Sequence, residues 1–146
     1  MKYYGICPAS CGEFVQGVMD RAEYLCSYAV DLYSTAEVEE KLNNINLGPL
    51  KSRKAIEAVF KKFNIPVEES KNISLKIRSK IPVGKGMASS TADIGATIGA
   101  TLGLIKKELS SEEIAKLAST IEPTDSIYIE KNSIFNPLNG EVIRYL

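Results

Sequence analysis

The 146-residue sequence contains no histidine and no tryptophan, and its 18 basic and 18 acidic residues give a net charge of zero. Without histidine, the chain cannot form a Ser-His-Asp triad, a histidine general base or a histidine-ligated metal site. A net charge of zero provides no overall positive field to attract nucleic acid or an anionic membrane. Carboxylates are therefore the natural proton acceptors of any catalytic site in this chain.

The few cysteines and the lack of long apolar runs restrict the cellular compartments that the sequence predicts for this protein. The three cysteines, Cys7, Cys11 and Cys26, are odd in number and form no C-x-x-C pair. This pattern disfavours a zinc site or a redox motif, predicts packing roles for Cys7 and Cys11, and favours a reduced, cytoplasmic compartment. The N-terminal residues lack the apolar run of a signal peptide, and no 18-residue apolar stretch could span a membrane.

Length and composition predict one compact domain with its own core, because hydrophobic residues make up 45% of the chain and charged residues 25%. The expected strands are Tyr3–Cys7, Leu25–Glu39, 73–77, Ile127–Ile129 and Val142–Tyr145, with loops at 8–17 and 43–49 and a turn at Asn139-Gly140. The expected helices cover 50–63 and 88–106, and a third begins at Ser110 with Glu113 as its capping-box partner. This partly segregated mixture predicts an α+β fold.

The most informative segment is IPVGKGMASSTADIGATIGATLG, residues 81–103. It predicts a strand end, a glycine-rich turn and a helix, in an arrangement that can bind an anion. Gly84 and Gly86 permit positive φ, and the free N–H groups at the helix start favour negative charge. The serine and threonine hydroxyls that follow add hydrogen-bond donors, and Lys85 adds a cation at the rim. An ordinary buried helix with a glycine-rich entry fits the same residues.

Small residues recur along this helix at intervals of four. Gly95, Gly99 and Gly103 form one row, although each glycine costs a helix about 1 kcal/mol relative to alanine. Close packing of this face on a sheet would compensate for that cost. Two familiar phosphate-binding motifs are absent: Gly86 follows Lys85 where a P-loop needs Ser or Thr, and Ser89 stands where a dinucleotide fingerprint needs glycine.

PVGKGMASSTAD, residues 82–93, resembles the second motif of the GHMP kinases, the family of galactokinase, homoserine kinase, mevalonate kinase and phosphomevalonate kinase. The usual form is Pro, three residues, then Gly-Leu-Gly-Ser-Ser-Ala; here Met87 replaces Leu, and Ala88 replaces the second Gly of that core. CPASCGEFVQG at 7–17, VDLYS at 30–34 and EPTDS at 122–126 resemble the L-threonine kinase branch, the PduX-like enzymes of cobalamin synthesis.

This resemblance implies the GHMP kinase N-terminal domain over residues 1–146, with a ribosomal protein domain 2-like fold of mixed or antiparallel sheet and helices. It also implies that the C-terminal GHMP domain lies outside this chain. The implied function is ATP- and magnesium-dependent phosphorylation of a small amino acid, L-threonine, to O-phospho-L-threonine. The residues that would surround the ATP phosphates are Pro82, Val83, Gly84, Lys85, Gly86, Met87, Ala88, Ser89, Ser90 and Thr91.

The resemblance assigns magnesium to Ser90 and Glu122, and catalytic roles to Asp125 as the base and to Lys85 near the phosphates. Which of the two carboxylates is the base and which the metal ligand stays open, and Asp125 also suits a purely local turn. Ser10, Glu13 and Gln16 would face the substrate, and Glu13 is a candidate for the ammonium group, although a turn-stabilising role is an alternative. Asp31 and Ser34 are weaker candidates.

Several functional alternatives remain at this point. The chain could be a half-domain that binds ATP but is inactive until a separate C-terminal half or a second copy completes the cleft. A GHMP kinase for homoserine, mevalonate or a sugar would share the same phosphate loop. A structural role like that of related ribosomal and translation-factor domains is disfavoured by the neutral charge, which argues against RNA binding.

Overall fold

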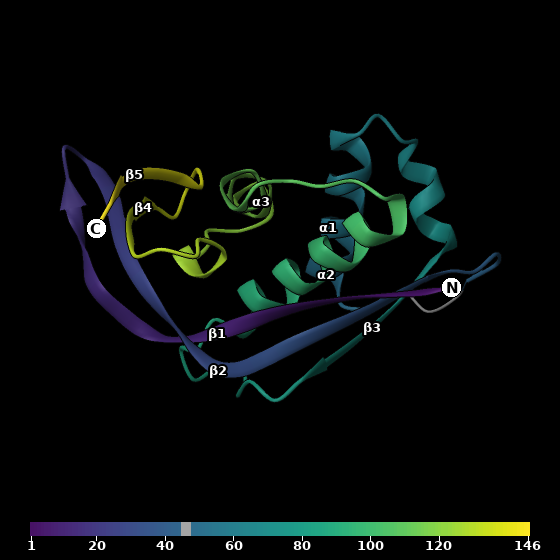
Figure 1. The fold of residues 1–146 in the computed structure, drawn as a ribbon, viewed down its shortest axis with the longest axis horizontal. Helices are drawn as coiled ribbons and strands as arrows, with labels where there is room; N and C mark the ends of the chain where they lie inside the picture. Colours follow the sequence, from purple (N-terminus) through teal and green to yellow (C-terminus); the bar gives the residue numbers. More distant parts are fainter. Residues whose placement is uncertain (45–47) are drawn as a thin grey trace.

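The computed structural model describes residues 1–44 and 48–146 and shows an antiparallel sheet with helices on one side (Figure 1). β1 (Lys2–Met19) and β2 (Ala22–Glu40) form a long hairpin, closed by Asp20 and Arg21, which both have positive φ. β3 (Ile73–Ser79) pairs with the second half of β2. β4 (Ser133–Asn136) joins β2 through Leu25 and Phe135 and continues to β5 (Glu141–Tyr145). The predicted α+β class is confirmed.

The helices form a second layer over the sheet. α2 (Ser89–Ile105) lies directly on β1 and β2, and both α1 (Leu50–Lys62) and α3 (Ser111–Ser119) pack on α2 (Figure 1). Two 3-10 helices, η1 (Val67–Asn72) and η2 (Ser126–Tyr128), connect these layers to the sheet. Over the described ranges, no helix is both long and apolar enough to cross a membrane.

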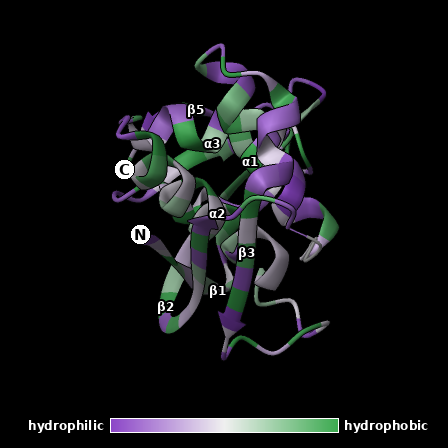
Figure 2. Ribbon diagram, turned by 90° about the vertical axis from the view of Figure 1, so that its right-hand side faces the viewer, coloured by the Kyte–Doolittle hydropathy of each residue, from purple (hydrophilic) through white to green (hydrophobic). Residues whose placement is uncertain are grey.

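Local sequence patterns account for α1, β3 and α3. The expected apolar face of α1 is buried at Ile56, Val59 and Phe60. β3 alternates apolar and polar residues along its length, as the hydropathy colouring shows (Figure 2). The capping box of α3 is formed: the Glu113 N–H donates to Ser110 Oγ at 3.2 Å, and the Ser110 N–H donates to Glu113 Oε1 at 3.1 Å.

The glycines of α2 allow the close packing that their spacing predicts. A Cβ at Gly99 would lie 3.6 Å from the Cα of Gly5 on β1, and a Cβ at Gly103 would lie 3.4 Å from the Tyr3 ring. Gly5 itself has no room, because a Cβ there would lie 1.9 Å from the Ala96 carbonyl oxygen. The helix and the sheet therefore approach each other through backbone surfaces, which fixes the position of the α2 N-terminus.

Two expectations about secondary structure are wrong. Residues 8–17 form no loop but continue β1, whose irregular register between Pro8 and Val15 absorbs the proline and glycine. β1 lies at the sheet edge, where proline is tolerated because one side of the strand has no hydrogen-bonded neighbour. Ile127–Ile129 is no strand, since Ser126–Tyr128 form η2, and the pairing strand β4 follows it instead. Of the expected loop at 43–49, residues 45–47 lie outside the described residues.

Candidate active site

The glycine-rich segment between β3 and α2 forms an exposed loop. Gly84 and Gly86 both have φ of +71°, and a Cβ at either would meet no atom within 4 Å. Ala88 adopts a left-handed conformation (φ 58°, ψ 39°) immediately before α2, which is strained for a residue with a side chain. No side chain caps the start of this described helix, so its first N–H groups are open to a ligand.

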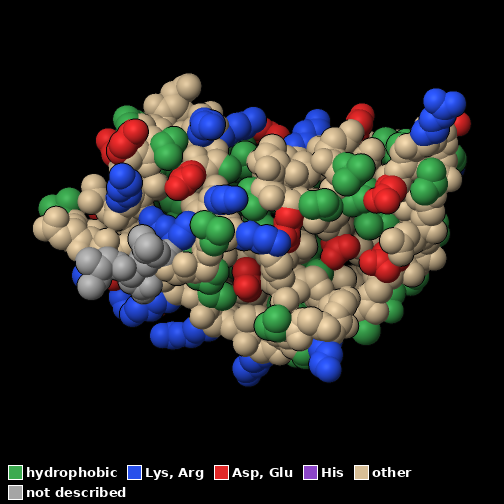
Figure 3. Space-filling model, turned by 180° about the vertical axis from the view of Figure 1, so that it is seen from behind, with side chains coloured by type: hydrophobic (Ala, Val, Ile, Leu, Met, Phe, Trp, Pro, Cys, Tyr) green, Lys and Arg blue, Asp and Glu red, His purple; other side chains and the backbone are tan. Residues whose placement is uncertain are grey.

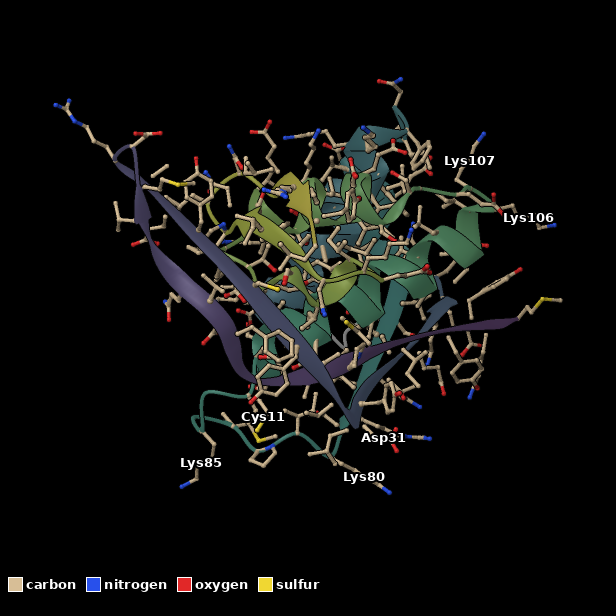
Figure 4. All side chains as sticks on the ribbon, turned by 60° about the vertical axis from the view of Figure 1, so that its left-hand side comes forward. Cys11, Asp31, Lys80, Lys85, Lys106 and Lys107 are labelled. Carbon is tan, nitrogen blue, oxygen red and sulfur yellow. The ribbon has the colours of Figure 1, made fainter. Side chains whose placement is uncertain are left out.

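β1 holds this loop in place. The N–H of Ser10 donates to the carbonyl of Met87 at 3.1 Å. The side chain of Ser10 is buried, whereas Glu13 and Gln16 are exposed. Cys11 lies beside the loop, and Lys85 extends from it into solvent (Figure 4). Cys11 is exposed, so the packing role expected for it is wrong.

Asp125 lies at the start of η2, opposite Ser27 of β2. Ser27 Oγ donates to Asp125 Oδ1 at 3.3 Å, and the Ser27 N–H donates to Ser126 Oγ at 2.9 Å. Burial raises the pKa of Asp125, and the negative charges of Glu13 and Glu122 raise it further, against the opposing effect of the Ser27 hydrogen bond. The structure thus brings together Asp125, Glu13 and Glu122, while Gln16 lies farther along the hairpin, beside Pro137.

Glu122 has a partner that the sequence did not indicate. Its carboxylate accepts a hydrogen bond from Lys51, in the first turn of α1, and forms an ion pair with it. Only 14% of the Glu122 side chain is exposed. Seen from behind, acidic side chains lie across the middle of the molecule, and basic side chains gather towards the end that carries α1 (Figure 3). Among the residues described, no cluster of three metal-ligating side chains occurs.

Tyr128 connects η2 to the start of α2. Its hydroxyl donates to the carbonyl of Thr91 at 2.5 Å, and its ring occupies the space left by the missing side chain of Gly95. Burial raises the Tyr128 pKa well above its usual value, so the phenol stays protonated and remains a donor. The sequence does not indicate this contact. Gly95 predicts close packing on this face of α2, but it does not identify Tyr128 as the partner.

A further carboxylate lies near the start of α2. Asp93 of α2 accepts a hydrogen bond from Ser34 Oγ of β2 at 2.5 Å. Burial raises the pKa of Asp93, and the Ser34 hydrogen bond partly opposes this shift. Burial and the Asp93 charge raise the pKa of the neighbouring Cys7 thiol to about 12, which makes that thiol unreactive. Asp31 is exposed and lines a different hollow beside Lys80, as Figure 4 also shows.

Comparison with known proteins connects this geometry to a family. The model of the GHMP kinases N terminal domain matches residues 51–129. The L-threonine kinase of Salmonella typhimurium is 44% identical over 92% of this chain and 44% of its own length, and that of Citrobacter freundii is 39% identical over 92% and 46%. This chain therefore spans about half the length of these curated relatives.

Solved structures share the fold over the whole chain. The mevalonate kinase of Methanococcus jannaschii superposes with a TM-score of 0.68 and 25% identity, covering 100% of this chain and 55% of that one. Another mevalonate kinase gives a TM-score of 0.69 with 27% identity, over 98% of this chain and 55% of that one. The expected N-terminal fold of the resembled family is thus confirmed.

Proposed function

Because the chain belongs to the GHMP kinase family, we propose that it is the nucleotide-binding half of a kinase that phosphorylates an amino-acid hydroxyl, that of L-threonine. The observation that carries this proposal is the similarity to L-threonine kinases over 92% of the chain, including both the loop and the Asp125 segment. The geometry supports it, because Tyr128 of η2, the 3-10 helix that follows the half-buried Asp125, is hydrogen-bonded to Thr91 in the first turn of α2.

The loop would bind the ATP phosphates through backbone N–H groups. Gly84 and Gly86 leave open space for a ligand, and the Ser10–Met87 bond fixes the loop against β1. Because its side chain is buried, we assign Ser10 to positioning this loop rather than to substrate contact. Lys85, which is exposed at the rim, is free to approach the outer phosphates.

Ser90 and Glu122 would hold magnesium, since one hydroxyl and one carboxylate complement phosphate and water oxygens around this ion. When bound, magnesium neutralises phosphate charge during transfer. Ser90 is partly exposed at the start of α2, and the Glu122 carboxylate is already oriented by Lys51. This donor set fits the ion, and Lys51 would share or release Glu122 when the nucleotide arrives.

Asp125 would accept the proton of the threonine hydroxyl. The hydroxyl oxygen forms a bond to the γ-phosphorus, the bond from that phosphorus to the β–γ bridging oxygen breaks, and ADP leaves with those electrons. Burial raises the Asp125 pKa and makes the carboxylate a better base than an exposed aspartate. Glu13 would attract the substrate ammonium group, because its exposed carboxylate lies on β1 opposite Ser27, the hydrogen-bond partner of Asp125.

The other half of the relatives' length would complete this cleft. We propose that a C-terminal GHMP domain, in the same or a separate polypeptide, covers the phosphates and excludes water. Without it, the chain would bind ATP but turn over slowly. A homoserine, mevalonate or sugar substrate is the second candidate, and the mevalonate kinase structures that share the fold favour mevalonate among these.

ADP release in the presence of ATP, magnesium and L-threonine tests the proposal. Asp125→Asn and Glu122→Gln should each abolish most of the turnover, whereas Glu68→Gln, an exposed acid on η1, should retain it. Calorimetry with ATP and magnesium accompanies the assay, so that binding without turnover identifies the half-domain alternative. Turnover of homoserine but not threonine would replace the substrate, and full activity of both variants would overturn the residue assignments.

A further inference from the structure

Asp93 is an acidic side chain in a region that the proposed function requires to bind anions. It follows Ser89 by four residues and Ser90 by three, so all three lie on one face of α2. Side chains of a helix point towards its N-terminus, which directs the Asp93 carboxylate over the first turn. Its Oδ1 is fixed there by the Ser34 hydroxyl at 2.5 Å, which limits its freedom to turn away.

No basic side chain in the described part of the chain forms an ion pair with this carboxylate. The ion pairs within the described parts of the chain are Lys2–Glu37, Lys51–Glu122 and Lys62–Glu113, and none of them includes Asp93. The buried Cys7 thiol is a neighbour of Asp93, and it stays protonated. Asp93 therefore places an uncompensated negative charge within about two helical turns of the N–H groups that would hold phosphate.

That charge affects two forms of the same nucleotide to different extents. It repels the triphosphate of metal-free ATP, whose charge is uncompensated, and this repulsion is strong at a partly buried site. It acts much less on ATP that carries magnesium, because the ion cancels part of the phosphate charge. We propose that Asp93 makes the site discriminate against metal-free nucleotide, so that the loop is filled by ATP together with its metal. This inference rests on the proposed nucleotide site.

Binding of ATP to the chain, measured by calorimetry at pH 8 with excess EDTA and then with excess magnesium, tests the role of Asp93. Asp93→Asn keeps an acceptor for the Ser34 hydroxyl but removes the charge. We expect it to tighten binding of metal-free ATP about tenfold and to change binding of magnesium-loaded ATP by less than about threefold. The ratio of the affinity for magnesium-loaded ATP to the affinity for metal-free ATP should therefore fall.

Two further variants distinguish the effect of the Asp93 charge from the effect of a structural change. Ser34→Ala removes the hydrogen bond but keeps the Asp93 charge, and Asp20→Asn removes an exposed charge at the tip of the β1–β2 hairpin. Asp20→Asn should retain the wild-type affinity ratio. Ser34→Ala should lower it less than Asp93→Asn does, because the charge remains although the carboxylate is no longer held in place. Thermal unfolding establishes that each variant is folded. An unchanged ratio in Asp93→Asn, or an equal fall in Ser34→Ala, would overturn the inference alone. A wild-type chain that binds neither form of ATP would overturn the proposed function and this inference with it.

Discussion

Replacing Gly95 by alanine tests whether the α2 glycines are there for packing. An added Cβ would lie 2.3 Å from Cε1 of Tyr128 and 2.8 Å from Sγ of Cys7. The Tyr128 ring cannot easily move, because its hydroxyl is bonded to the Thr91 carbonyl. We expect overpacking to cost about 2–3 kcal/mol. The gain in helix propensity offsets about 1 kcal/mol of this cost, so the variant should be less stable by about 1–2 kcal/mol.

Gly99→Ala is the matched control, since it makes the same chemical change one turn later. Its Cβ would meet only the Gly5 Cα, at an ordinary contact distance of 3.6 Å. This variant should gain the helix propensity without overpacking and become up to about 1 kcal/mol more stable. The two variants should therefore differ in the free energy of unfolding by about 2–3 kcal/mol, in opposite directions from the wild type.

Urea unfolding followed by circular dichroism measures both free energies of unfolding. A second step adds Tyr128→Val to each variant, because removing the ring should relieve the Gly95→Ala cost. The double-mutant cycle should give a coupling energy above about 1 kcal/mol for positions 95 and 128, and close to zero for positions 99 and 128. If Gly95→Ala proves as stabilising as Gly99→Ala, the described packing of Tyr128 against α2 is wrong.

Three further predictions concern pH, capping and thiol access. Because burial raises the Asp125 pKa in the folded state, the ionised carboxylate destabilises the fold at neutral pH. Asp125→Asn should therefore raise the melting temperature at pH 8. This gain should disappear as the pH falls below the pKa of Asp125 in the unfolded chain, about 3.8. Ser110→Ala should lower the free energy of unfolding by about 1 kcal/mol in urea titrations, and an unchanged value would contradict the capping box. An alkylating reagent should modify Cys11 in the native protein but reach Cys7 and Cys26 only after unfolding, as mass spectrometry of native and denatured samples can determine.

Elements defined by neighbouring residues could be predicted from the sequence. The α1 face, the alternation of β3 and the Ser110 capping box each depend on residues a few positions apart. The glycine loop at 82–87 is also local, because positive φ at Gly84 and Gly86 follows from the residue type. Such features persist in the fold because packing does not oppose them.

Elements defined by contacts with distant residues could not be predicted from the sequence. Pro8 and Gly12 suggest a loop, but pairing with β2 extends the strand through them and places the irregularities at an edge. Ile127 and Ile129 alternate like a strand, yet Ser126 bonds to Ser27 and Tyr128 inserts against Gly95, so the segment turns instead. Long-range contacts here override a weak local pattern.

The same distinction between local and distant residues applies to the candidate site. Motifs identify the loop and the carboxylates Glu122 and Asp125, but not what holds them. Lys51 is 71 residues from Glu122, Thr91 is 37 from Tyr128, and Ser34 is 59 from Asp93. No periodicity or spacing relates residues so far apart, so their pairing required the structure.

The proposed function requires above all that the loop between β3 and α2 binds the phosphates of ATP. Backbone amide resonances recorded while a non-hydrolysable ATP analogue and magnesium are added test this claim residue by residue. The largest shifts should fall on residues 84–91 and on Ser10, whose N–H is bonded to Met87. Shifts confined to the separate groove between α1 and α3, around Lys54 and Leu117, or no shifts at all, would contradict it.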